Sequence, residues 1–256
     1  MIKHLWQKEI QAELYTWKGM LWLVIAAVLF SFTSYLLLTN SELSLLDQTE
    51  LMWLFGKVVI AAALLVVTID ASILITNEFE HETLESLFLA PVTLPMFVLG
   101  KILSSLTLWA AVLVVATPYI IVISAGTHLA PAFIGYVALL GTLGVLGFTF
   151  LIFGISLFFR SVRNSITTGL VILFVFAIPA LFATNLKNGI VAQVFGRANP
   201  IDNIFSALDN ILVDYKTALL SNWQFVLPLL LFCVVTFLIL IFSMSRFEKH
   251  GIIRTE

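Results

Sequence analysis

Long runs of apolar residues, separated by short polar segments, dominate the pattern along the chain. A membrane-spanning helix needs about 20 consecutive, mostly apolar residues, and six runs meet this length. The stretch from Ile102 to Phe159 contains no Asp, Glu, Lys or Arg, so it holds two crossings and the turn between them. The pattern predicts an all-α integral membrane protein, a single domain over 1–256, with spans at 20–39, 52–76, 96–123, 132–159, 165–184 and 224–245.

Residues 1–18 carry apolar side chains at helical spacing, including Trp6 and Trp17, with Lys3 and Lys8 on other faces. Such a helix lies in the membrane interface with its tryptophans at headgroup level. The alternative is a cytoplasmic extension of the first span. That span is too long for a signal-peptide core and no small-residue cleavage site follows it, so we expect it to be retained.

The segment 185–223, between the fifth and sixth spans, is the longest connection. Asn199-Pro200 is typical of a helix start, with an N-cap followed by proline at the first helical position. An apolar stripe then predicts an external amphipathic helix over 200–216, which either lies on the outer membrane surface or re-enters the membrane. The stripe consists of Ile201, Ile204, Phe205, Leu208, Ile211, Leu212 and Tyr215.

Glycines recur in the fourth span. Small residues let membrane helices approach closely, although glycine is also generally frequent in such helices. We expect only close packing from them. The glycines are Gly135, Gly141, Gly144, Gly147 and Gly154.

The distribution of Lys and Arg predicts the orientation, because cytoplasmic loops carry an excess of these residues. With the N-terminus inside, nine lie in cytoplasmic segments and three outside, while Lys57 lies within a span. Both termini are therefore expected in the cytoplasm. The inner set is Lys3, Lys8, Lys18, Lys101, Arg160, Arg163, Arg246, Lys249 and Arg254; the outer set is Lys187, Arg197 and Lys216.

Composition narrows the function classes. The chain is 61% hydrophobic and 11% charged, whereas soluble domains carry roughly 25% charged residues. A net charge of −2 gives no support to a nucleic-acid partner. The single cysteine, Cys233, excludes an intramolecular disulfide.

The polar segment between the second and third spans predicts a docking element. It carries four glutamates and His81, then Leu84, Leu87 and Phe88, and Pro91 disfavours helix beyond Ala90. A short helix over 78–91 with an apolar edge, held between two membrane helices, suits a groove on a cytoplasmic protein. Glu78, His81, Glu82 and Glu85 share one face and are metal-ligand types, but a solvated docking face is favoured, and no metal is expected.

The run from Glu80 to Val92 resembles the signature of type-2 ABC exporter permeases. In that family an acidic-Thr-Leu-Glu-x-Leu-x-x-(Thr/Ser/Ala)-Pro segment follows the second of six spans and forms the coupling helix. The glycine that often precedes the threonine is Glu82 here. The resemblance covers the whole chain, from the N-terminal helix with Lys8-Glu9 to the helices between the last two spans.

The resemblance implies partners and site residues. Two permease copies, as a homodimer or a heterodimer, would rest on separate cytoplasmic ATPase subunits that hold ATP and Mg. The membrane would be a prokaryotic inner membrane. The residues expected at the ATPase contact are Glu80, Glu82, Thr83, Leu84, Glu85, Leu87, Phe88 and Pro91, with Arg160 and Arg163 in the neighbouring cytoplasmic turn.

The chain itself lacks the phosphate-binding loop Gly-x-x-x-x-Gly-Lys-[Ser/Thr]. Gly56-Lys57-Val58 and Gly100-Lys101-Ile102 lack both the first glycine and the hydroxyl. We therefore expect no ATP hydrolysis, and no cofactor, in this chain.

Lys57 and Asp70 both lie in the second span, where ionisable residues are costly and suggest function. Lys57 is close enough to the outer end to snorkel to the headgroups, and the alternative is a substrate-facing role. Asp70 is expected to pair with Arg160 or Arg163, with a proton relay as the alternative.

The sequence thus favours a permease subunit of an ATP-driven exporter. Its 22 phenylalanines and nearly charge-free spans suit a hydrophobic or amphipathic substrate. A haem-export-type permease is the alternative within the class. A secondary transporter would be expected to show more polar midplane residues and broken spans in paired positions.

Overall fold

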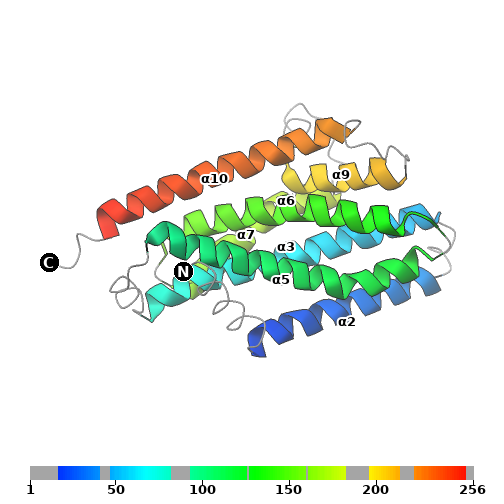
Figure 1. Ribbon diagram of the computed structural model, residues 1–256, viewed down its shortest axis with the longest axis horizontal. Helices are drawn as coiled ribbons and strands as arrows, with labels where there is room; N and C mark the ends of the chain where they lie inside the picture. Colours follow the sequence, from blue (N-terminus) through cyan, green and yellow to red (C-terminus); the bar gives the residue numbers. More distant parts are fainter. Residues whose placement is uncertain are drawn as a thin grey trace.

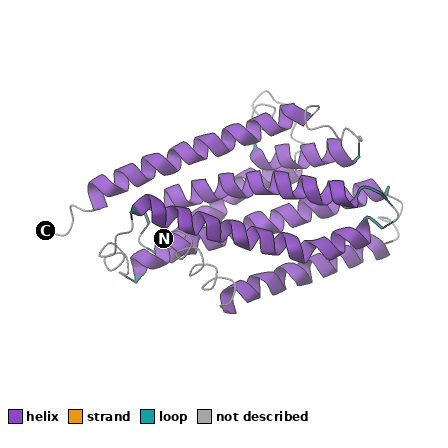
Figure 2. Ribbon diagram, viewed as in Figure 1, coloured by secondary structure: helices purple, strands orange, loops and turns teal. Residues whose placement is uncertain are grey.

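The computed structural model is an all-helical bundle, and it describes residues 17–40, 47–81, 93–125, 127–159, 161–182, 196–213 and 222–251. No strand occurs in these ranges (Figure 2). The helices are α2 (Trp17–Thr39), α3 (Gln48–Glu80), α5 (Leu94–Ile123), α6 (Ala130–Ser156), α7 (Val162–Phe182), α9 (Pro200–Leu212) and α10 (Trp223–Gly251).

Six of these helices, all except α9, are long and apolar enough to cross a membrane. The prediction of six spans and of a multi-pass membrane protein is confirmed at this level. The longest, α3, has 33 residues and is about 50 Å long at 1.5 Å per residue. This exceeds the roughly 30 Å of hydrocarbon in a bilayer, so an upright α3 reaches beyond the hydrocarbon.

The six long helices run back and forth along the bundle axis (Figure 1). We call the end that holds Glu80, Leu94 and Val162 the proximal end, and the opposite end, with Gln48 and Ile123, the distal end. In Figure 1 the proximal end is on the left, where α10 finishes. Helix α3 is the central element, since it packs against α2, α5, α6, α7 and α9.

The apolar core has two parts. The larger lies toward the distal end, where residues such as Phe55 and Phe133 are fully buried together with the apolar face of α9. The smaller lies toward the proximal end, around Ile75, Phe97 and Phe153. Large side chains of α2, α7 and α10 remain exposed, as expected of surfaces that face lipid.

Helix α9 inserts into the distal half of the bundle. It runs along the bundle axis in Figure 1 and packs against α3, α6, α7 and α10. Nine of its 13 residues are buried, including Ile204, Phe205 and Leu208. The apolar stripe of α9 is therefore buried against other helices of the bundle, and its placement relative to the membrane stays a prediction. The predicted start at Pro200 is confirmed, the helix ends at Leu212, and residues 214–216 lie outside the described ranges.

The glycines of α6 pack as expected at most positions. A Cβ built at Gly141 would lie 2.5 Å from the Trp109 ring, and one at Gly144 would lie 2.7 Å from Ile204 Cδ1. A Cβ at Gly147 would meet the Phe232 ring at 2.6 Å. Gly135 is different, because nothing lies within 4 Å of its Cβ position. The expectation of close packing is therefore wrong for Gly135, which lies in the more exposed first turns of α6.

Candidate functional site at the proximal end

The segment that resembles a coupling helix joins α3 to α5 at the proximal end. Helix α3 ends at Glu80, His81 forms a turn, and α5 begins at Leu94 after Thr93. Of the residues expected at the ATPase contact, Glu80 and Arg163 lie in the described ranges. The others, Glu82, Thr83, Leu84, Glu85, Leu87, Phe88, Pro91 and Arg160, lie outside them, as do residues 1–16 of the expected interfacial helix.

Glu80 connects the end of α3 to the start of α7. Its Oε2 accepts a hydrogen bond of 2.9 Å from the backbone N–H of Val162, the first residue of α7. The first N–H groups of a helix have no partner within the helix, and a carboxylate is stabilised there by the helix dipole. Arg163, the next residue, is exposed. The structure thus places Glu80 and Arg163 at the same end of the bundle, and their role at an ATPase contact stays a prediction.

Lys101 of α5 and Glu78 of α3 form an ion pair close to the contact of Glu80 with α7. Lys101 Nζ lies 3.2 Å from Glu78 Oε1, and the two side chains are 5% and 24% exposed. Lys101 Nζ also lies 5.3 Å from the centroid of the Phe97 ring. The count of Lys and Arg assigns Lys101 to the cytoplasmic side, and the structure adds that this lysine is buried between helices. The pattern that could have predicted the pair is a glutamate near the end of one span and a lysine near the start of the next, because antiparallel packing brings the two together.

A hydrogen bond between two hydroxyl groups joins α6 to α7 at the proximal end. Ser156 Oγ and Ser165 Oγ lie 2.8 Å apart, and both residues are buried. Ser156 is the last residue of α6, and Ser165 lies in the first turn of α7. With Glu78, Glu80 and Lys101, these contacts connect α3, α5, α6 and α7 through polar groups. These serines could not be predicted from the sequence, because hydroxyl groups are frequent in membrane helices and follow no distinctive spacing.

Asp70 lies deeper in the bundle. It is 8% exposed and lies ten residues, about 15 Å along the helix, from Glu80. Arg160 is outside the described ranges and Arg163 is exposed. A pair between Asp70 and one of these arginines therefore stays a prediction.

Lys57 belongs to a separate cluster in the distal half. Its Nζ lies 3.3 Å from the centroid of the Trp53 ring and 5.5 Å from that of Phe205 on α9. Trp53 Nε1 donates a hydrogen bond of 3.1 Å to the carbonyl oxygen of Phe205. The charges of Asp202 and Asp209, also on α9, act on the Lys57 amine. Lys57 thus lies at the contact between α3 and α9, about 20 Å along α3 from Asp70.

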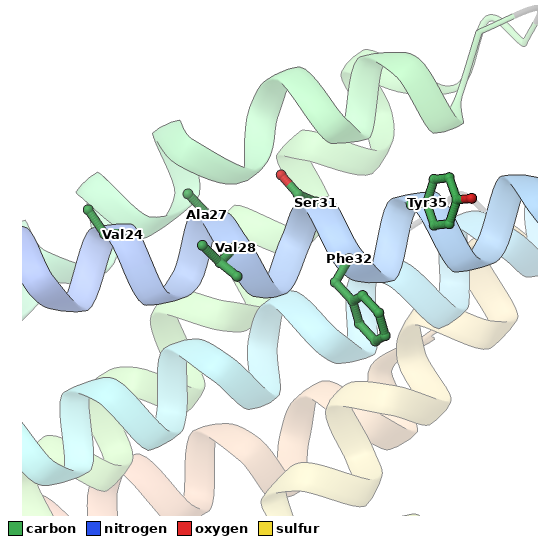
Figure 3. Close-up of a pocket in the computed structure, with 6 residues that line it drawn as sticks. All are labelled: Val24, Ala27, Val28, Ser31, Phe32 and Tyr35. Carbon is green, nitrogen blue, oxygen red and sulfur yellow. The ribbon is translucent and has the colours of Figure 1, made fainter.

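A shallow pocket on α2 lies away from these groups. It has a volume of about 480 Å³ and is lined by Val24, Ala27, Val28, Ser31, Phe32 and Tyr35. Figure 3 shows Ser31 directed toward α5, where its Oγ lies 2.7 Å from the hydroxyl of Tyr119. The other lining residues form an open, mostly apolar face, which fits a surface covered by lipid chains.

Comparison of the chain with protein-family models and with curated proteins finds no match in either.

Proposed function

We propose that the chain is the membrane-spanning permease subunit of an ATP-driven exporter of the type-2 ABC class. The observation that supports this proposal most directly is the contact made at the start of the segment that resembles a coupling helix. It begins at Glu80, and Glu80 accepts a hydrogen bond from the first N–H of α7. A displacement of the segment would therefore act directly on α3, on α5, which follows it, and on α7.

The proximal end faces the cytoplasm in this proposal. Its support is the excess of Lys and Arg in the segments at that end. Arg163 at the start of α7 and Arg246 and Lys249 near the end of α10 belong to this set. The N- and C-termini then lie inside, and α9 enters the membrane from the outer side.

The mechanism couples nucleotide chemistry in a partner to movement of the bundle. Two permease copies rest on two ATPase subunits, which hold ATP and Mg and close on each other when ATP binds. That closure shifts residues 82–91 in each permease. The Glu80 contact passes the shift to α7, and the ion pair of Glu78 with Lys101 passes it to α5. A hydrophobic or amphipathic substrate then alternates between the two sides of the membrane, and a haem-export-type cargo is the alternative.

A secondary transporter is the second candidate, and one observation favours it. Asp70 and Lys101 are ionisable residues buried in the bundle, and Glu78, the partner of Lys101, is half-buried; such groups mark ion or proton pathways in membrane proteins. The two candidates differ in their partners, because a secondary transporter needs no ATPase subunit.

The experiment is a double substitution, Leu87→Ala with Phe88→Ala, in the full chain expressed with its genomic neighbours. We expect it to reduce recovery of the ATPase subunit and to lower transport-coupled ATP hydrolysis, because buried apolar anchors carry much of the affinity of an interface. Leu238→Ala with Phe242→Ala is the matched control, since this leucine and phenylalanine are exposed on α10.

The result is decided by two measurements. Stoichiometric recovery of an ATPase with the wild-type chain supports the exporter, and its absence supports the secondary transporter. If an ATPase is recovered equally well with the double variant, and ATP hydrolysis remains coupled, residues 82–91 are not its docking element.

A further inference from the structure

Three hydroxyl-bearing residues are buried in the middle of the bundle on three different helices. Thr68 of α3, Ser105 of α5 and Thr149 of α6 are each at most 1% exposed. Their Oγ atoms have no hydrogen-bond partner within the part of the chain that the structure describes. A buried polar group without a partner is destabilising, because it has given up its hydrogen bonds to water, so three of them together need a physical account.

The helix backbone offers such residues a local partner, and their neighbours use it. A serine or threonine hydroxyl in a helix can donate to the carbonyl oxygen four residues earlier. Ser72 donates in this way to Thr68 at 2.8 Å, Thr107 to Leu103 at 2.7 Å and Thr142 to Ala138 at 2.6 Å. Thr68, Ser105 and Thr149 lie on the same three helices and do not make this bond. Their hydroxyl groups are therefore turned away from their own backbone.

Thr68 and Thr149 lie at similar depths. Helices α3 and α6 run in the same direction, and a Cβ built at Gly144 would lie 3.8 Å from Leu64 Cδ2, so these two positions are neighbours. Thr68 is four residues beyond Leu64 and Thr149 is five beyond Gly144. The two threonines therefore lie within about one helical turn, 5.4 Å, in depth.

Ser105 joins this layer from α5. Trp109 donates from Nε1 to Thr142 Oγ1 at 3.0 Å, which fixes the register of α5 against α6. Ser105 is one turn from Trp109 and so lies on the same face of α5, and Thr149 is two turns from Thr142 and so lies on the same face of α6. Both hydroxyl groups thus belong to faces that α5 and α6 turn toward each other, and they lie within about one helical turn, 5.4 Å, in depth.

We propose that Thr68, Ser105 and Thr149 form an internal hydration site, a binding site for water in the middle of the bundle. Ordered water inside proteins makes about three hydrogen bonds to buried polar groups that lack other partners. Each hydroxyl can donate and accept, so water can bridge the layer. The site joins α3, α5 and α6 through solvent, and it does not depend on the proposed function.

A hydration site predicts whether isosteric substitutions raise or lower the thermal stability of the protein. Replacing a truly dry, unpartnered hydroxyl by a methyl group removes a desolvation cost and leaves stability unchanged or raised. Replacing a hydroxyl that holds a bridging water removes part of that network. We therefore expect Thr68→Val, Thr149→Val and Ser105→Ala each to lower the thermal unfolding midpoint of the full chain in detergent, by about 2–4 °C.

Coupling and direct labelling complete the test. The double variant Thr68→Val with Thr149→Val should lose less than the sum of the single losses, because one substitution already disrupts the shared water. Thr236→Val is the matched control, since Thr236 is equally buried and donates to the carbonyl oxygen of Phe232 at 2.8 Å. Its effect should add to the others without coupling.

X-ray hydroxyl-radical footprinting of the wild-type chain gives the independent readout, because radiolysis of bound water oxidises the side chains next to it. Leu106, beside Ser105 on α5, should be labelled, and Thr149→Val should reduce its labelling. Unchanged or raised midpoints with additive double variants, or no labelling of Leu106, would show that the layer is dry and overturn the proposal.

Discussion

The distal and proximal halves of the bundle are held together by different kinds of contact. In the distal half, α9 fills the space among α3, α6, α7 and α10 with apolar side chains. Its polar exceptions have protein partners: Asn199 caps Ile201 N and donates to the carbonyl oxygen of Phe176, and Asn203 donates to that of Arg197. This half resembles the interior of a soluble protein, where packing is dense and buried polar groups are hydrogen-bonded.

In the proximal half the apolar core is smaller, and polar and charged groups add further connections between the helices. Glu80 contacts α7, Lys101 joins α5 to Glu78, and Ser156 meets Ser165. These contacts are few and directional, so a shift of one helix alters them one by one, whereas a packed apolar core resists any shift. The distal half therefore relies more on apolar packing, and the proximal half has more polar contacts between helices; under the proposed function, the proximal end is the one that meets a partner.

The largest effect is expected from breaking the ion pair in the proximal half. Lys101→Met should lower the free energy of unfolding by about 3–5 kcal/mol, because it leaves the carboxylate of Glu78, which is only 24% exposed, without this counter-charge. Unfolding in mixed detergent micelles measures this loss. The double variant Lys101→Met with Glu78→Gln should recover part of it. A single variant as stable as the wild type would show that the pair contributes little and would weaken the contrast between the halves.

A cavity in the distal half should have the next largest effect. Leu208 on α9 is fully buried, and Leu208→Ala should cost about 2–4 kcal/mol, since the surrounding side chains relax only partly into the space. Leu231→Ala on the exposed face of α10 is the control. If both substitutions cost the same, α9 does not pack in the bundle as described.

The contact between Trp53 and α9 should contribute less. Trp53→Phe keeps an aromatic ring under Lys57 but removes the hydrogen bond to the Phe205 carbonyl oxygen, and we expect a loss of about 1 kcal/mol. Trp223→Phe, at an exposed tryptophan, is the matched control. Accessibility of a cysteine placed at Ala207, a buried position of α9, should rise in the Trp53 variant; unchanged accessibility would mean that Trp53 does not hold α9.

The smallest effect on stability is expected at Glu80. Glu80→Gln keeps an oxygen that accepts from Val162 but removes the charge at the start of α7, a change of about 0.3–1 kcal/mol. Under the proposed function this small change should still reduce coupled ATP hydrolysis in the complex. A variant with lower stability and full coupling would assign Glu80 to structure alone.

Some of this architecture could be predicted from local sequence. The six spans follow from apolar runs, because the length of such a run decides whether a helix can cross the hydrocarbon. The start of α9 follows from Asn199 and Pro200, which act through their own backbone. The stripe of Ile204, Phe205 and Leu208 predicted that one face of that helix would be buried.

The tertiary structure decided what each of these faces meets. The interior of a helical bundle and the hydrocarbon of the membrane are both apolar. The apolar stripe on α9 is therefore compatible with either, and the sequence alone could not decide between them. The positions of the glycines in α6 likewise do not reveal that Trp109 and Phe232 pack against them. Lys101 and Glu78 are 23 residues apart in the chain, and only the antiparallel packing of α3 and α5 gives each the opposite charge that makes its burial tolerable.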